Sequence, residues 1–215
     1  MDQNIHKGQK VLRFGADLKD AELVVILLHG RGATAESMLP LVEALSLEKT
    51  NFIIPQAGLN RWYPNSAFVP IETNEPDLTS ALELIDSLIL MIRQEGFSHK
   101  QIGFGGFSQG ACLALEYAAR KPSNYAGLFA FTGALIGSPD QPREYIGSFE
   151  GMPVFIGGSD VDPWVAHDLL VQTVGVFEEL GAQVDFRIYP GMSHTIIQDE
   201  IDAVREMLMA GKKSI

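Results

Sequence analysis

The sequence predicts an α/β protein: a mostly parallel β-sheet with helices on both faces. Strand-like apolar runs alternate along the chain with helix-like patterns, an order typical of parallel sheets. Several runs are apolar without interruption, as expected of strands buried on both faces. The chain has 215 residues, of which 46% are hydrophobic and 20% charged. A chain of this length can form one large hydrophobic core and does not require a second domain, so we expect a single domain over 1–215.

Turn signals and hydrophobic periodicity divide the chain into twelve expected elements. The strands cover 11–14, 23–29, 52–55, 101–107, 125–132, 153–158 and 184–189. The helices cover 38–45, 76–95, 109–120, 163–180 and 195–209, and Gly96, Gly181 and Gly211 would end three of them. Pro40 should lie near the start of the first helix or distort it. Residues 133–151 are rich in Gly, Pro and Ser and predict a long loop.

The charge balance disfavours two classes of partner. Lys and Arg number 16 and Asp and Glu 27, which gives a net charge of −11. Such a chain is poorly suited to nucleic acid or to an anionic membrane surface. The longest wholly apolar stretch, 23–28, is far shorter than the roughly 20 residues that span a bilayer. We therefore expect no nucleic-acid partner and no membrane span.

Two further observations concern the compartment. The single cysteine, Cys112, rules out an intrachain disulfide framework and a multi-cysteine zinc site, and it is compatible with a reducing compartment. Residues 1–6 lack the basic region and following apolar run of a signal peptide. We expect a soluble, cytoplasmic protein.

Chemistry-bearing residues gather where four expected strands end. Ligands of open α/β sheets bind outside the carboxyl ends of the strands. Those ends read His-Gly-Arg-Gly at 29–32, Ser-Gln-Gly at 108–110, Ser-Asp-Val-Asp at 159–162 and Pro-Gly-Met-Ser-His at 190–194. A candidate anion-binding loop, a nucleophile, an acid and a base are therefore expected at one edge of the sheet.

The candidate nucleophile is Ser108. Residues 106–110 match G-x-S-x-G between an apolar run and a helical pattern, which is the setting of a nucleophile elbow. The pattern alone would arise by chance about one time in eight at this composition, so the context carries the inference. The flanking glycines allow a tight turn, and the helix N-terminus supplies N–H groups. The alternative is that Ser108 only caps the following helix.

A serine nucleophile needs a base. Of the five histidines, His194 alone follows the last strand in a glycine-containing loop. We expect His29 to anchor its loop, and His6, His99 and His167 to be surface or packing residues.

The base in turn needs an orienting carboxylate. Both Asp160 and Asp162 follow the strand 153–158, and Asp162 also stands before Pro163, where an aspartate is a natural helix cap. The pattern leaves the two candidates open.

Hydrolases with this elbow stabilise the oxyanion with two backbone N–H groups, expected here from Arg31 and Gln109. The Arg31 side chain is expected either to contact an anionic substrate group or to lie in solvent. Apolar residues near the strand ends are candidates for a substrate pocket, with core packing as the alternative: Trp62, Tyr63, Phe68, Leu135 and Trp164.

These residues resemble the α/β-hydrolase superfamily and, within it, the phospholipase/carboxylesterase group that includes the acyl-protein thioesterases. The matching stretches are 28–32, 105–110, 160–163 and 191–194, of which Gly-Gly-Phe-Ser-Gln-Gly at 105–110 is the most specific. The resemblance implies the α/β-hydrolase fold, and it implies Asp162 as the acid because the family's aspartate directly precedes a proline. It also implies the oxyanion donors named above, no metal or organic cofactor, a small ester or thioester substrate, and a small dimer.

The chain departs from the family's thioesterases at two places. Residues 61–65 and 32–34 read Arg-Trp-Tyr-Pro-Asn and Gly-Ala-Thr, where the thioesterases commonly carry a Trp-Phe-Asp segment and a Gly-Asp pair. The chain therefore resembles bacterial carboxylesterase-like members more closely. Dienelactone hydrolases share the fold but use a cysteine where Ser108 stands.

The expected function is a serine hydrolase that forms an acyl-enzyme on Ser108. The alternatives are a non-catalytic binding protein with a hydrolase fold, an acyltransferase, or a dienelactone-hydrolase-like enzyme.

Overall fold

A computed structural model describes residues 4–213 and contains the expected mostly parallel sheet. Its seven strands lie in the order β1-β3-β2-β4-β5-β6-β7. Only β1 runs antiparallel to its neighbour, β3, and the other adjacent strands pair in parallel. The strands are β1 (Val11–Gly15), β2 (Leu23–Leu28), β3 (Thr50–Pro55), β4 (Ile102–Phe107), β5 (Gly127–Phe131), β6 (Pro153–Gly158) and β7 (Gln183–Ile188).

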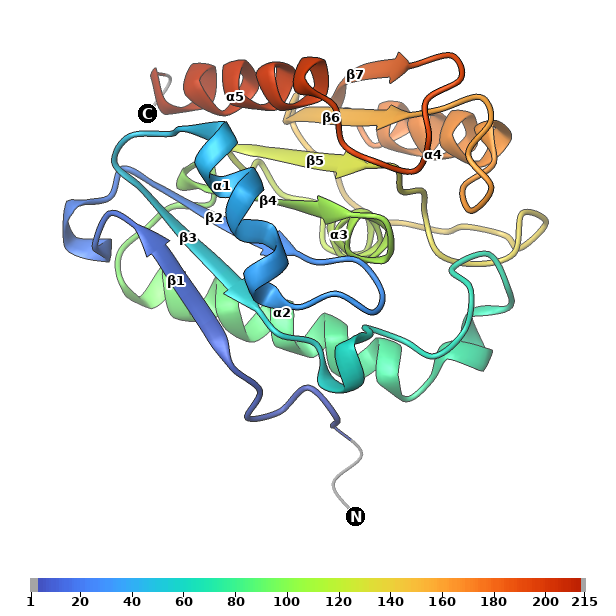
Figure 1. The fold of residues 1–215 in the computed structure, drawn as a ribbon, viewed down its shortest axis with the longest axis horizontal. Coiled ribbons are helices and arrows are strands. Elements are labelled where there is room, and N and C mark those ends of the chain that lie inside the picture. Colours follow the sequence, from blue (N-terminus) through green and yellow to red (C-terminus); the bar gives the residue numbers. More distant parts are fainter. Residues whose placement is uncertain (1–3, 214–215) are drawn as a thin grey trace.

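Helices cover both faces of the sheet (Figure 1). They are α1 (Leu39–Leu45), α2 (Asp77–Gln94), α3 (Gln109–Arg120), α4 (His167–Glu179) and α5 (Gln198–Lys213). Helices α1 and α5 pack on one face, and α2, α3 and α4 on the other. Alternate residues of the wholly buried strand β2 enter the two cores, which explains its unbroken apolar sequence. Across the described residues, no helix is both long and apolar enough to span a bilayer.

Two helix boundaries differ from those predicted. Helix α4 begins at His167 rather than at 163. The Asp162 carboxylate accepts the N–H groups of Trp164 and Val165, as a helix cap would, but the extended Ala166 (ψ 143°) interrupts the chain before the helix. Helix α5 begins at Gln198 and continues through Gly211, which was expected to end it.

A close contact explains the second difference. A Cβ at Gly211 would lie 2.9 Å from the carbonyl oxygen of Ala126. The glycine therefore allows α5 to pack against the sheet and does not end the helix.

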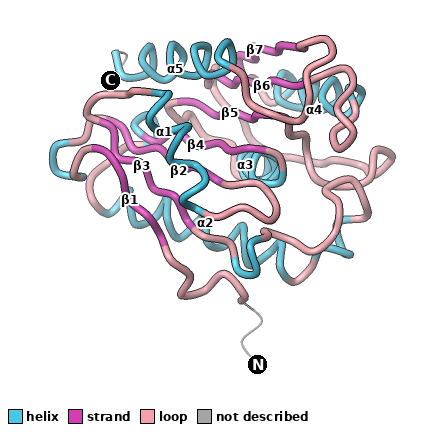
Figure 2. The backbone as a smooth tube through the Cα atoms, in the orientation of Figure 1, coloured by secondary structure: helices cyan, strands magenta, loops and turns pink. Residues whose placement is uncertain are grey.

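The first helix and the long loop follow expectation. Pro40 lies in the first turn of α1, after a short 3-10 turn at Ala35–Met38. The connection from β5 to β6 contains no helix or strand (Figure 2). Arg143 secures this loop by donating to the carbonyl of Ile136 (2.6 Å), and the Tyr145 hydroxyl donates to the buried carboxylate of Glu116 (3.0 Å).

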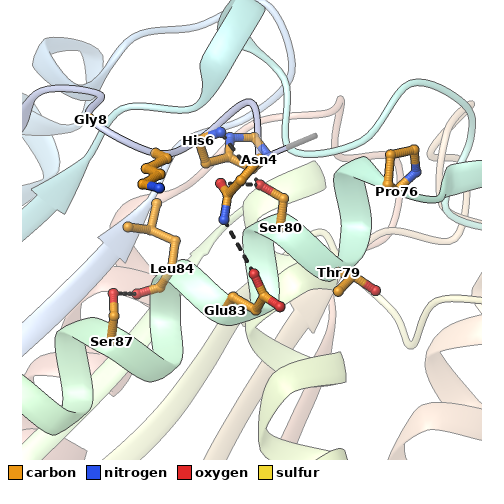
Figure 3. Close-up of a pocket in the computed structure, with 10 residues that line it drawn as sticks. Asn4, His6, Gly8, Pro76, Thr79, Ser80, Glu83, Leu84 and Ser87 are labelled. Carbon is orange, nitrogen blue, oxygen red and sulfur yellow. Dashed lines mark hydrogen bonds between the residues drawn. The ribbon is translucent and has the colours of Figure 1, made fainter. Parts of the chain in front are cut away.

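The N-terminal segment lies along α2, with a cavity between them (Figure 3). Asn4 joins two α2 residues: its amide donates to Glu83 (3.2 Å), and it accepts from the Ser80 hydroxyl (2.6 Å). His6 is buried, and burial lowers its pKa. Its Nδ1 accepts the N–H of Gly58 and its Nε2 contacts the carbonyl of Trp62. His6 is therefore a packing residue that ties the N-terminal segment to the loop after β3.

The turn from β4 into α3 is possible only because two of its residues are glycines. A Cβ on either Gly106 or Gly110 would overlap the carbonyl oxygen of Leu28, at the end of β2. Backbone atoms cannot move aside as a flexible side chain can, so the end of β2 and the start of α3 touch backbone to backbone.

We expect Gly110→Ala to lower the free energy of unfolding by about 1–3 kcal/mol, because the new methyl group meets fixed backbone. Gly175→Ala in α4 is the matched control, since a Cβ there has no atom within 4 Å. The free energy of unfolding of the control should rise by about 0.5–1 kcal/mol, because alanine has a higher helix propensity than glycine. Urea denaturation of both variants measures the two values. Equal effects at the two positions would contradict the close contact at Gly110.

Glu200, in the first turn of α5, is a buried carboxyl group. Its Oε2 accepts the N–H of Ile197 (3.0 Å), whereas Oε1 lies against Gly157 of β6 without a hydrogen-bond partner. Its pKa is raised from 4.5 to about 7, mainly by burial and to a smaller extent by the charge of the neighbouring Asp199. The folded protein therefore holds a proton that the unfolded chain releases at lower pH.

Because of this proton, the free energy of unfolding decreases as the pH rises. As pH rises from 4.5 to about 7, the unfolded chain loses the Glu200 proton first, so the free energy of unfolding falls. Glu200→Gln removes that dependence. Its free energy of unfolding relative to that of the wild type should therefore increase across this interval and level off above it. Urea denaturation at pH 5 and pH 8 measures this difference. Glu206→Gln, at an exposed position of α5, is the control and should leave the pH dependence unchanged.

Candidate active site

Ser108 occupies the turn between β4 and α3. Its backbone has φ 54° and ψ −119°, angles that are strained for a residue with a side chain. Its N–H donates to the carbonyl of Phe131 (2.9 Å), and its carbonyl accepts the N–H of Cys112 (3.0 Å). These bonds hold the strained turn between the sheet and the helix. The serine therefore sits at the positive end of α3, as in a nucleophile elbow.

His194 and Asp162 are joined by a short hydrogen bond, 2.7 Å from Nδ1 to Oδ2. The Asp162 side chain is 1% exposed and that of His194 is 18% exposed. The second carboxylate oxygen of Asp162 accepts the N–H groups of Trp164 (2.8 Å) and Val165 (3.1 Å). The carboxylate is thus fixed by its own loop, and a proton on Nδ1 leaves His194 Nε2 able to accept one.

Ser108 and His194 line the same cavity, whose volume is 560 Å³. Within the described residues, no hydrogen bond joins the Ser108 hydroxyl to His194. In enzymes without substrate, such catalytic bonds are often long and tighten only in the reacting complex. The arrangement is consistent with a hydroxyl nucleophile facing a base.

Asp160 takes a different position from Asp162. Its Oδ1 accepts the N–H of Gly191 (2.7 Å), in the loop that carries His194. It therefore connects the loop after β6 to the loop after β7 but does not contact the imidazole. The sequence pattern gave no sign of this backbone partner, 31 residues away.

His29 anchors the loop after β2. Its ring is buried, its Nε2 accepts the N–H of Ala57 (3.1 Å), and its Nδ1 lies 2.8 Å from the carbonyl of Gly30. Burial also lowers its pKa. Because Nε2 accepts, the proton sits on Nδ1, and neither nitrogen is available to a substrate.

Arg31 and Gln109, the expected oxyanion donors, both line the cavity beside Ser108. Gln109 is the first residue of α3, so its N–H has no partner within the helix. The Arg31 side chain is exposed, as the second expectation had it, but it is also hydrogen-bonded to the protein. Its guanidinium donates to the carbonyls of Pro64 (2.7 Å) and Asn65, and it lies 6.0 Å from the centre of the Tyr63 ring.

Three of the five expected pocket residues line the cavity: Tyr63, Phe68 and Trp164. The expectation is wrong for Trp62, which is fully buried and packs against the rings of His6 and His29, with its indole N–H donated to the carbonyl of His29 (2.8 Å). It is also wrong for Leu135, a core residue whose N–H donates to the Thr173 hydroxyl (3.0 Å).

Phe107 lines the cavity although the sequence did not single it out. Its ring lies 5.0 Å from the imidazole of His194, measured between centroids. As the last residue of β4, directly before the serine, it could have been found from the strand pattern alone.

Comparisons with known proteins identify the family of the chain. A family model described as Phospholipase/Carboxylesterase matches residues 15–211. The crystal structure of a phospholipase/carboxylesterase from Dyadobacter fermentans is 39% identical, with a TM-score of 0.90, and the match covers 94% of this chain and 97% of that one. Acyl-protein thioesterase 1 of Saccharomyces cerevisiae is 27% identical over 228 residues, or 95% of this chain and 98% of the relative.

A third relative, the Bacillus cereus carboxylesterase, is 19% identical with a TM-score of 0.76 and covers 95% of each chain, a likeness that concerns the fold alone. The expected α/β-hydrolase fold is therefore confirmed. The chain belongs to the phospholipase/carboxylesterase family, and it is a carboxylic ester hydrolase.

Proposed function

We propose that the protein hydrolyses small carboxylic esters or thioesters through an acyl-enzyme on Ser108. His194 Nε2 takes the hydroxyl proton as Ser108 Oγ bonds to the acyl carbon, and Asp162 steadies the imidazolium. The backbone N–H groups of Arg31 and Gln109 stabilise the oxyanion. The proton then passes to the departing alkoxide or thiolate, and water releases the acid by the same steps in the second half-reaction.

One observation carries this assignment. The 2.7 Å bond from His194 to Asp162 orients a base in the cavity that Ser108 lines, and Ser108 is held strained at the start of a helix. The residues concerned come from the ends of β2, β4 and β6 and from the loop after β7. Because residues from four separate strand ends contribute to one site, we propose that the chain is one catalytic domain.

Replacement of the nucleophile tests the proposal directly. We expect Ser108→Ala to lower kcat for p-nitrophenyl butyrate by about 10⁶-fold, since the other groups cannot form an acyl-enzyme. Labelling by a fluorophosphonate probe should be lost with it. Ser193→Ala, which removes an exposed hydroxyl next to His194, is the control and should react like the wild type. Full turnover or labelling of Ser108→Ala would refute the assignment.

The two aspartates can be told apart by amide substitution. Asp162→Asn should lower kcat by about 10⁴-fold, because the new amide favours the wrong imidazole tautomer. Asp160→Asn keeps an oxygen that can accept the N–H of Gly191. Its kcat should fall by less than about tenfold, a loss typical of a positioning contact. Steady-state kinetics of the two variants provide the comparison. A larger loss from Asp160→Asn would make Asp160 the orienting acid.

A further inference from the structure

The two expected oxyanion donors are tied by their side chains to one short stretch of backbone, residues 62–65. At one end, the Arg31 guanidinium donates to the carbonyls of Pro64 and Asn65. Because the planar guanidinium donates two N–H groups to the carbonyls of successive residues, both the orientation of the side chain and its distance from residues 64–65 are fixed. The backbone N–H of Arg31 therefore has its position set partly by residues more than thirty positions away.

At the other end, the Gln109 amide forms a two-sided clamp. Its Oε1 accepts the N–H of Trp62 (2.9 Å), and its Nε2 donates to the carbonyl of Tyr63 (2.8 Å). The Tyr63 hydroxyl also donates to the Gln109 carbonyl (3.4 Å). The Gln109 side chain is buried, so a lost partner would leave a polar group without water.

Residues 62–65, which we call the strut, are themselves well supported. The Trp62 indole N–H donates to the carbonyl of His29 (2.8 Å), and the buried ring of His6 contacts the Trp62 carbonyl (3.1 Å). Nearby, the N–H of Gly32 donates to the carbonyl of Asn60 (2.7 Å). The strut thus spans from the loop after β2 to the start of α3. One end is hydrogen-bonded to Arg31 and the other to Gln109, which directly follows Ser108.

We propose that the strut sets the separation of the two oxyanion N–H groups, with the side chains of Arg31 and Gln109 as positioning groups. This inference rests on the proposed function of the site. Donors contribute to catalysis only where they match the position of the oxyanion, so a small displacement is costly in the transition state and not in the bound substrate. Because one backbone segment contacts both side chains and is anchored at Trp62, a displacement at either end is passed along the segment to the other donor.

The experiment combines single and double variants. Arg31→Ala and Gln109→Ala should each lower kcat for p-nitrophenyl butyrate by about tenfold, with KM within about twofold, since only the transition state loses stabilisation. The double variant should lie within about threefold of the worse single variant. Values of kcat are divided by the fraction of sites that react with a fluorophosphonate, which removes the contribution of misfolded protein.

A conservative variant provides a second measurement. Arg31→Lys reaches one carbonyl in place of two, so it should retain a kcat between those of the wild type and Arg31→Ala. Arg143→Ala is the matched control, because Arg143 binds backbone carbonyls of the loop after β5 in the same manner, away from the nucleophile. It should lower the melting temperature while leaving kcat unchanged.

Two results would overturn the proposal. One is a kcat within twofold of the wild type in either alanine variant. The other is a loss in the double variant equal to the product of the single losses, which would mean that each side chain holds its own donor independently. Failure of the proposed function looks different, because wild-type protein would then not react with the fluorophosphonate at all.

Discussion

The contact between the end of β2 and the start of α3 is the constraint on which the rest of the site depends. The carbonyl of Leu28 faces both Gly106 and Gly110, and neither position has room for a side chain. The chain that leaves β2 carries His29 and Arg31, while the turn beside it carries Ser108. Backbone contact at this point brings the loop that carries Arg31 next to the serine. The glycines are required by that close approach as much as by the turn itself.

The imidazole is positioned by different means. The loop that carries His194 is held by side chains: Asp160 binds Gly191, Asp162 binds the ring, and Glu200 binds the N–H of Ile197 at the start of α5. Three carboxyl groups thus hold one loop, each by a hydrogen bond to a separate point. The position of Ser108, the proposed nucleophile, depends on strained backbone between regular elements. The position of His194, the proposed base, depends on a set of hydrogen bonds that individual substitutions can remove one at a time.

The order of strands and helices could be predicted from the sequence because it follows from local hydrophobic periodicity. The elbow could be predicted because its glycines and serine are contiguous. What the sequence did not reveal are contacts between distant residues. Trp62 is of a residue type that often lines pockets, but its indole N–H donates to the carbonyl of His29 and its ring packs against two histidine rings. The start of α4 lies later than predicted because Ala166 is extended and separates the turn capped by Asp162 from the helix, a local conformation that the capping pattern does not reveal.

The two tryptophans of the chain differ in a way that makes the protein its own optical reporter. Trp62 is fully buried, whereas Trp164 is 71% exposed at the cavity and gives its backbone N–H to Asp162. An indole in water and an indole in a dry core emit at different wavelengths, so the two signals separate without a label. The emission of Trp164 therefore reports on the one turn of chain that holds Asp162, at the rim of the cavity that Ser108 and His194 line.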